Sequence, residues 1–136
     1  MNQLINWQDQ YSVKIKEIDN QHSKLVGLIN QLHNAMREAK GKEIVGSIIN
    51  ELISYTKYHF TAEEKLMKDN NYPNFLRHKT EHDNLTSKVI EFQTNFNSGK
   101  APLSMELMQF LKDWLVNHIV KVDKEYSGYL NSKGIN

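Results

Sequence analysis

Five of the six histidines in this chain, together with two carboxylates, are spread over four amphipathic segments in a pattern that constrains both fold and chemistry. Neutral imidazole is a good ligand for zinc, copper, iron and nickel, and a carboxylate can bridge two ions. The pattern therefore predicts transition-metal chemistry. The candidate ligands are His22, His59, Glu63, His78, His82, His118 and Asp123.

Apolar residues recur at intervals of three and four over four segments, which predicts four helices. The first helix is expected from about Asp19, as its N-cap, to about Ala39, and the second is expected to end before Asn70-Asn71. The third is expected to follow Pro73, and the fourth to be capped by Ser104 and to end before Gly134. Short connections favour an all-α, antiparallel up-down-up-down four-helix bundle. We expect one domain over residues 1–136, with an N-terminal arm (1–18) packed along the bundle (19–131).

In such a bundle, the starts of the odd helices and the ends of the even helices meet at one end. All seven candidate ligands fall at these positions, so we expect them to converge. The opposite end is expected to be apolar core. Its residues are Leu32, Met36, Ile44, Ile48, Phe92, Phe96, Leu107 and Leu111.

The spacing of the ligands also predicts a local irregularity. Side chains four apart share a helix face, as in His59/Glu63 and His78/His82. The five-residue step from His118 to Asp123 corresponds to about 500° of rotation at ~100° per residue, which is well off a common face. A single π turn would bring both side chains inward, and such turns are frequent at functional sites. We therefore predict one near residues 118–123.

Composition excludes several classes of function. Seventeen basic and sixteen acidic residues give a net charge of +1, so neither nucleic acid nor an anionic membrane is expected as a partner. No apolar run approaches the roughly 20 residues that span a bilayer. The absence of cysteine excludes disulfides, iron–sulfur clusters and thiolate zinc sites. The cytoplasm is the expected compartment, and Met1 is expected to be a native start without a signal peptide.

Ligand counting indicates an incomplete coordination shell. Five imidazole nitrogens and four oxygens from two bridging carboxylates make nine ligand atoms. One bridging oxide or hydroxide adds a bond to each ion and brings the total to eleven, whereas two octahedral ions require twelve. One position would remain open for a small exogenous ligand.

Several short motifs surround the candidate ligands. They are IDNQH at 18–22, HFTAEE at 59–64, Met67, Tyr72-Pro73, HKTEH at 78–82 and WLVNHIVKVD at 114–123. With these motifs the chain resembles the hemerythrin family, in particular its single-domain prokaryotic members, from about Trp7 to Tyr126. No ligand position departs from the family pattern.

The resemblance implies a non-haem di-iron centre with an oxo or hydroxo bridge that binds O2 reversibly. By position, three histidines would saturate one iron, two would hold the iron with the open site, and the carboxylates would bridge. The first group is His78, His82 and His118, the second is His22 and His59, and the bridges are Glu63 and Asp123.

The implied role is oxygen storage, transport or delivery, without catalysis. Leu115, one turn before His118, is expected to line the O2 pocket, and Trp7 and Phe60 are candidates to help close it. O2 is the expected ligand, and an oxygen-using enzyme is the candidate partner. Because the apolar seams are used within the bundle, a monomer is expected.

Three other functions are weighed against this one. A ferritin-like carboxylate di-iron enzyme would carry Glu-x-x-His, but no histidine here has a glutamate three residues before it. A structural zinc or mixed-metal site that only stabilises the bundle would favour a closed ligand shell. The ligand set of this chain is one short of a closed shell, which argues against such a site. Sensing of O2, NO or redox state, or iron handling, remains the alternative use of the same site.

Residues near the ligands provide comparisons. His33 lies about 16 Å along the helix from His22, at 1.5 Å per residue, and is expected to be at the surface or hydrogen-bonded elsewhere. Glu64 and Glu81 are expected to point to solvent, with hydrogen bonding to a ligating imidazole as the minor alternative.

Overall fold

The computed structural model describes residues 4–38, 42–99 and 105–136, and every regular element within them is helical. The elements are a 3-10 turn η1 (Asp9–Tyr11), α1 (Lys16–Arg37), α2 (Lys42–Asp69), α3 (Phe75–Asn97), α4 (Met105–Asn117), a π-helical segment η2 (His118–Asp123) and α5 (Lys124–Ser132). None of the described helices is both long and apolar enough to cross a membrane.

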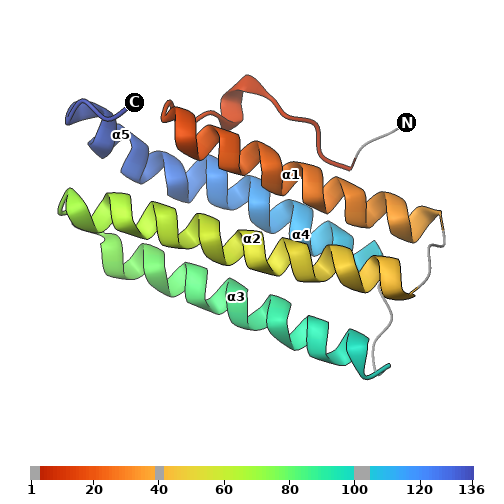
Figure 1. The fold of residues 1–136 in the computed structure, drawn as a ribbon. Coiled ribbons are helices and arrows are strands. Elements are labelled where there is room, and N and C mark those ends of the chain that lie inside the picture. Colours follow the sequence, from red (N-terminus) through yellow and green to blue (C-terminus); the bar gives the residue numbers. More distant parts are fainter. Residues whose placement is uncertain (1–3, 39–41, 100–104) are drawn as a thin grey trace.

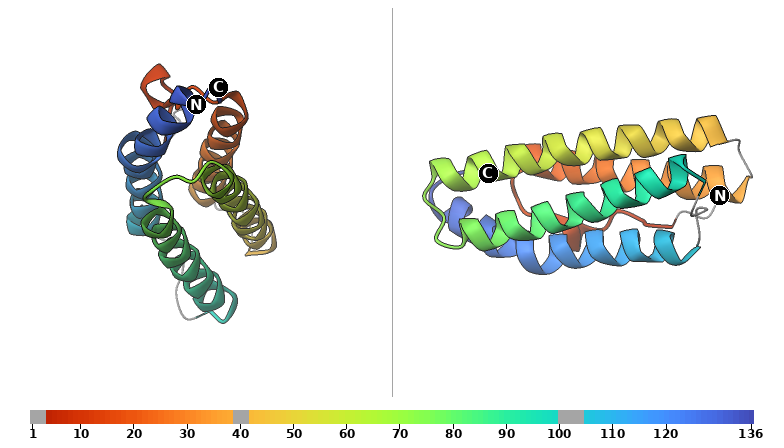
Figure 2. Two further views of the ribbon diagram at one scale, coloured as in Figure 1. Left: turned by 90° about the vertical axis from the view of Figure 1, so that its left-hand side faces the viewer. Right: turned by 90° about the horizontal axis from the view of Figure 1, so that it is seen from below.

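The long helices alternate in direction, which confirms the predicted antiparallel four-helix bundle. Helix α2 runs back along α1, α3 runs back along α2, and α4 continues through η2 into α5 along α1 (Figure 1). The further views in Figure 2 show the same side-by-side arrangement. The ends of α2 and α5 therefore lie beside the starts of α1 and α3.

The start of the first helix differs from the prediction. Helix α1 begins at Lys16, after Ile15 in extended conformation, so the arm ends three residues earlier than expected. Asp19 is not an N-cap, because its carboxylate accepts bonds from Ser12 Oγ at 2.6 Å and from the Val13 amide at 2.8 Å. Its contacts are with the arm, which helical periodicity does not reveal. The predicted Ser104 cap and the Ala39 helix end lie outside the described residues.

The N-terminal arm packs along the bundle, as predicted. The Asn30 side chain pairs with the backbone of Ile5, accepting from its amide at 2.9 Å and donating to its carbonyl at 2.8 Å. Asn131 of α5 donates to the Lys14 carbonyl at 3.1 Å. These bonds join the arm to α1 and α5, and η1 packs against η2. The arm is thus part of the wall around the ligand-bearing end.

Buried apolar residues form two clusters, one on each side of the ligand level. The larger fills the end that the sequence predicts to be apolar. The smaller closes the bundle beyond the ligands, so the polar group is not at the end of the molecule but between two apolar layers. The smaller cluster consists of Val13, Ile15, Ile18, Met67, Tyr72, Tyr126 and Leu130.

Among the described side chains of the predicted apolar end, which exclude Leu107, one is wrongly placed. Ile44 is 52% exposed, whereas Val45 and Ile49 are buried, so the true apolar stripe of α2 is displaced by one residue there. Most steps in the predicted stripe are four residues long, and such steps drift around a helix of 3.6 residues per turn, which explains the error at the end of α2 distant from His59. Leu32 and Leu111 are buried as predicted.

Candidate metal centre

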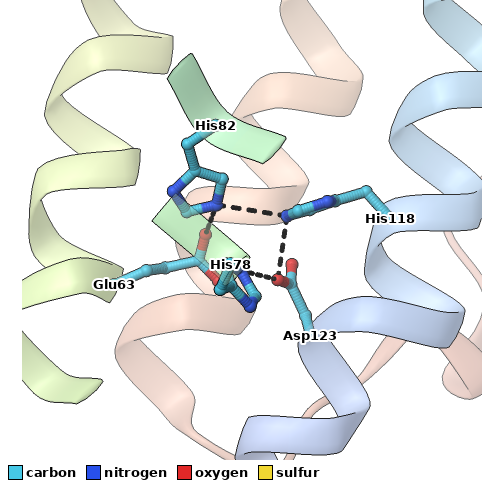
Figure 3. A group of neighbouring side chains, drawn as sticks. All are labelled: Glu63, His78, His82, His118 and Asp123. Carbon is cyan, nitrogen blue, oxygen red and sulfur yellow. Dashed lines mark hydrogen bonds and ion pairs between the residues drawn. The ribbon is translucent and has the colours of Figure 1, made fainter. Parts of the chain in front are cut away.

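The structure brings all seven predicted ligands together in two overlapping groups. One contains His78, His82 and His118, the other contains His22 and His59, and Glu63 and Asp123 belong to both. Within each group the potential ligand atoms lie within 4.8 Å of one another. Figure 3 shows how α2, α3 and η2 present five of these side chains to a common centre. Two neighbouring sites that share both carboxylates suit two ions with carboxylate bridges.

The local backbone explains how each pair of side chains reaches the centre. In α2, the four-residue step places His59 Nε2 3.0 Å from Glu63 Oε1. At His118–Asp123 the helix adopts the predicted π form, and His118 Nε2 lies 3.0 Å from Asp123 Oδ1. A π turn adds one residue per turn, so side chains five apart face the same way. The π-helix prediction is confirmed.

Each carboxylate lies between histidines of both groups. Asp123 places Oδ2 3.0 Å from His22 Nε2 and Oδ1 3.0 Å from His78 Nε2. Glu63 places Oε1 3.4 Å from His82 Nε2 and Oε2 3.8 Å from His22 Nε2. Both carboxylates thus face each group at once, as bridging ligands would.

The polar atoms of the cluster fit a metal pair better than a hydrogen-bonded network. His22, Glu63 and Asp123 are 0% exposed. Among the described residues, buried atoms without a hydrogen-bond partner include both ring nitrogens of His22, Nε2 of His78, Oε1 of Glu63 and both carboxylate oxygens of Asp123. Unpartnered buried polar atoms are costly, and atoms converging on common points are typical of metal sites. The residues present fit two transition-metal ions.

The charges of the metal-free cluster depend on protonated histidines. Burial and repulsion from Asp123 raise the pKa of Glu63. The interactions with His59 and His82 outweigh these effects, so the net pKa of Glu63 lies well below its usual value. Burial also raises the pKa of Asp123, yet His118, His22 and His78 bring it far below normal. Burial lowers the pKa of His82, while Glu63 and Glu64 raise it to about 9. Because metal must displace such protons, metal binding should strengthen as pH rises toward that value.

Three polar residues outside the predicted ligand set lie beside the ligands. Tyr126 donates its hydroxyl to Glu63, Gln21 Oε1 lies 2.7 Å from His59 Nδ1, and Glu64 Oε2 lies 2.9 Å from His82 Nδ1. Glu64 therefore does not point to solvent, and the minor alternative from the sequence, a hydrogen bond to a ligating imidazole, is the one observed. It follows Glu63 directly in the HFTAEE motif, which was the only available signal. Glu81, like Glu64, is half-buried.

Loss of the Tyr126 hydroxyl should weaken the bundle. Burial and the nearby Glu63 and Asp123 charges hold the pKa of Tyr126 well above normal, so the hydroxyl remains a donor. Bonds to charged acceptors contribute about 1.5–3 kcal/mol. Tyr126→Phe should lower the free energy of unfolding of the metal-free protein by this amount, measured by urea denaturation. Tyr58→Phe, at a ring that is 59% exposed, is the control, and equal effects would contradict the assignment.

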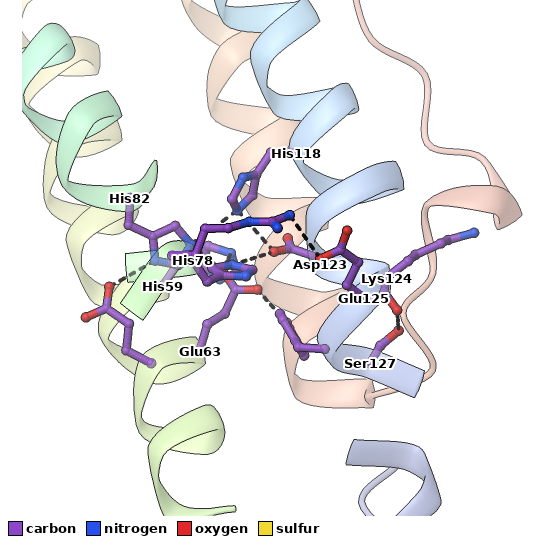
Figure 4. Close-up of polar contacts among 12 residues, drawn as sticks. His59, Glu63, His78, His82, His118, Asp123, Lys124, Glu125 and Ser127 are labelled. Carbon is purple, nitrogen blue, oxygen red and sulfur yellow. Dashed lines mark hydrogen bonds and ion pairs between the residues drawn. The ribbon is translucent and has the colours of Figure 1, made fainter. Parts of the chain in front are cut away.

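On the outer side, a surface contact joins two of the ligand-bearing segments. Arg77, in the first turn of α3, donates to Glu125 of α5 at 3.4 Å. Figure 4 shows Glu125 close to Asp123, at the start of α5. Both side chains are largely exposed, so the contact contributes at most about 1 kcal/mol. It lies next to His78 in sequence but adds no ligand to the cluster.

The three residues predicted to line the O2 pocket occupy different environments. Phe60 stacks on His82 with ring centroids 3.7 Å apart and planes 1° apart. Leu115 is buried and lines a cavity of about 20 Å³ with apolar walls, beside Trp114 and Thr56. Trp7 is 37% exposed and its ring packs against Tyr11 of the arm. Neither observation places Trp7 at the cluster, so its role stays a prediction.

His33 is not a surface residue. It is 7% exposed, and its Nδ1 has no hydrogen-bond partner among the described residues. Burial and the charge of Arg37 lower its pKa, so it is neutral near pH 7. It belongs to neither ligand group, which matches its predicted distance from the site.

The fold and the cluster together define a four-helix-bundle protein with a buried histidine and carboxylate cluster that could hold metal ions. The hemerythrin HHE cation-binding domain matches residues 13–130. The bacteriohemerythrin of Methylococcus capsulatus is 35% identical over 130 residues, covering 95% of this chain and 98% of that protein. The bacteriohemerythrin of Pseudomonas aeruginosa is 38% identical over 120 residues, covering 88% and 77%. The chain belongs to the hemerythrin family.

Solved structures agree with this assignment. A crystal structure of wild-type hemerythrin is similar to this chain with a TM-score of 0.87 and 33% sequence identity, covering 92% of this chain and 96% of that one. The similarity thus extends over most of this chain.

Proposed function

We propose that this protein binds O2 reversibly at a non-haem di-iron centre, for oxygen storage, transport or delivery. The observation that carries the proposal is the pair of overlapping groups that share both carboxylates. With five histidines, this set leaves two six-coordinate ions one ligand short after a single oxo or hydroxo bridge. Histidine-rich ligation suits iron, and an open position suits a small neutral ligand.

Each part of the site has a role in this function. A bound di-iron pair supplies two electrons that can be shared with O2 and recovered on its release. His78, His82 and His118 would hold one iron, His22 and His59 the other, and both carboxylates would bridge. The apolar layers on either side keep water from the centre, which favours release of unreacted O2 over irreversible oxidation. The small cavity at Leu115 is apolar, as O2 requires.

An optical gas cycle tests the proposal. The iron-loaded protein is reduced with dithionite, freed of reductant, and followed through argon, air and argon again. A charge-transfer band that forms in air, fades under argon and returns in air is the expected result. A band that forms once and persists would contradict reversible binding and favour redox sensing or catalysis.

Shortening Leu115 should accelerate irreversible oxidation. Leu115, three residues before His118, lines a cavity of about 20 Å³, and Leu115→Ala widens this cavity enough to admit additional water. The expected result is a several-fold faster decay of the O2-bound spectrum. Leu28→Ala, at another 2% exposed core leucine outside the cavity lining, controls for the general loss of packing, about 2–5 kcal/mol. Equal decay rates in the two variants would contradict the assignment of Leu115 to the O2 pocket.

The remaining functional statements depend on the same proposal. The role is non-catalytic, with O2 as the ligand and an oxygen-using enzyme as a candidate recipient. A monomer and a cytoplasmic location stay predictions from the sequence. Sensing of O2, NO or redox state, or iron handling, stays the alternative use of the same site.

A further inference from the structure

The two candidate metal positions differ in the residue that is hydrogen-bonded to the Nδ1 atom of one of their histidines. His82, in the three-histidine group, presents Nδ1 to Glu64 Oε2 at 2.9 Å. His59, in the two-histidine group, presents Nδ1 to Gln21 Oε1 at 2.7 Å. In both residues Nε2 faces the cluster, within 3.0–3.4 Å of Glu63. The Nδ1 atom must therefore carry the proton and donate it when Nε2 holds a metal.

The acceptors have different charges. Glu64 is a carboxylate whose side chain is 20% exposed, and it links α2 to α3 through His82. Gln21 is a buried neutral amide that links α1 to α2 through His59. Hydrogen bonds to ionised acceptors are about twice as strong as neutral ones. The Nδ1 atom of His82 therefore has a negatively charged acceptor, whereas the acceptor at Nδ1 of His59 is neutral.

The orientation of His82 is fixed from a second side. The Phe60 ring is parallel to the imidazole at a centroid distance of 3.7 Å, so the ring cannot tilt freely. Phe60 and Glu64 lie four residues apart on α2 and therefore on the same helix face. Together they hold one imidazole by stacking and by a charge-assisted bond, with Nε2 aimed at the cluster.

We propose that Glu64 is a positioning residue that makes the three-histidine position the tighter of the two metal positions, and that Gln21 leaves the two-histidine position weaker. An acceptor carboxylate increases the basicity of the imidazole and strengthens its bond to a metal ion. The preference rests on the proposed two-metal centre and adds to the difference in histidine number. In iron-loaded protein the same charge favours the ferric ion, because an anion stabilises the more highly charged ion more strongly. The iron with the open position is then less biased toward oxidation.

Cobalt(II) titration tests this assignment without O2. The full chain, freed of metal, is titrated with Co²⁺ against a competing chelator, and the two binding steps are resolved by absorption. Glu64→Gln keeps the shape and a hydrogen-bond acceptor but removes the charge. It should weaken the first step by about ten- to a hundred-fold, the usual effect of removing such a partner, and change the second step much less. Gln21→Glu should strengthen the second step.

A matched variant and a spectroscopic signature separate positioning from general damage. Glu51→Gln makes the same change on α2 at a residue paired with Lys24 at 3.6 Å, and it should alter neither step. In the Co²⁺ protein, the paramagnetically shifted proton on His82 Nδ1 should move in Glu64→Gln and remain in place in Glu51→Gln. Equal weakening of both steps, or no change in the first, would overturn the proposal.

The experiment distinguishes this proposal from that of O2 binding. If Glu64→Gln weakens the first Co²⁺ step but the iron protein shows no reversible O2 band, only the O2 function fails. If O2 binding is reversible and Glu64→Gln changes the affinity of neither Co²⁺ step, only the proposed role of Glu64 fails.

Discussion

Glu63→Ala or Asp123→Ala should each abolish binding of two metal ions per chain. Each carboxylate belongs to both ligand groups, so its removal takes one ligand from each ion at once. It also leaves histidines that its negative charge no longer balances in a fully buried site. Breaking such a buried charge pair costs about 3–5 kcal/mol in proteins. Iron per chain, quantified after loading and desalting, is the measurement, and it should fall from two to one or none.

His33→Ala is the control for this experiment. His33 is buried, like the ligands, and lies on the same helix as His22, but it belongs to neither group. It should retain two irons per chain. Equal iron loss in His33→Ala and Glu63→Ala would mean that the ligands have been assigned to the wrong residues. Full retention of iron in Glu63→Ala would exclude Glu63 as a bridging ligand.

Removal of metal should cause the largest change in thermal stability. In the metal-free protein, the raised pKa of His82 keeps this ring protonated beside the buried carboxylates, whereas bound ions would satisfy the converging atoms directly. An ion present at a thousand times its dissociation constant stabilises the folded state by about 4 kcal/mol. For a domain of this size, that corresponds to a fall in Tm on the order of 10 °C when a chelator removes the metal. Thermal unfolding by circular dichroism, with and without chelator, measures it.

The Glu63→Ala variant shows whether this shift comes from the candidate centre. Its Tm should be low with or without iron, and the chelator should change it little. A chelator-dependent shift of the same size in Glu63→Ala would place the stabilising metal elsewhere. A wild-type Tm independent of chelator would mean that the cluster does not hold metal tightly.

The arrangement of the candidate ligands was predictable because it depends on few physical rules. Helical periodicity predicts four helices, short connections predict alternating directions, and these together bring His22, Glu63 and His78 to one level. The step from His118 to Asp123 predicts a π turn, because no regular helix presents both side chains inward. Each of these inferences uses only local geometry and the order of the elements.

The features that the sequence did not reveal depend on tertiary contacts. Asp19 has the position of an N-cap, but the arm occupies its carboxylate through Ser12 and Val13. Glu64 lies off the axis-facing stripe and reaches His82 only because α3 packs against that side of α2. Tyr126 reaches Glu63 from 63 residues away in sequence. Such partners follow from how the helices are rotated against each other, which periodicity alone does not define.

The central claim is tested most directly by counting iron and releasable O2 in one sample. Reduced, iron-loaded protein is equilibrated with air, passed rapidly through a desalting column, and purged with argon while an oxygen sensor records the released gas. A reversible di-iron carrier should release one O2 for every two irons and repeat this after a second exposure to air. Two irons per chain with no released O2 would contradict the account, because the centre would then consume O2 rather than carry it.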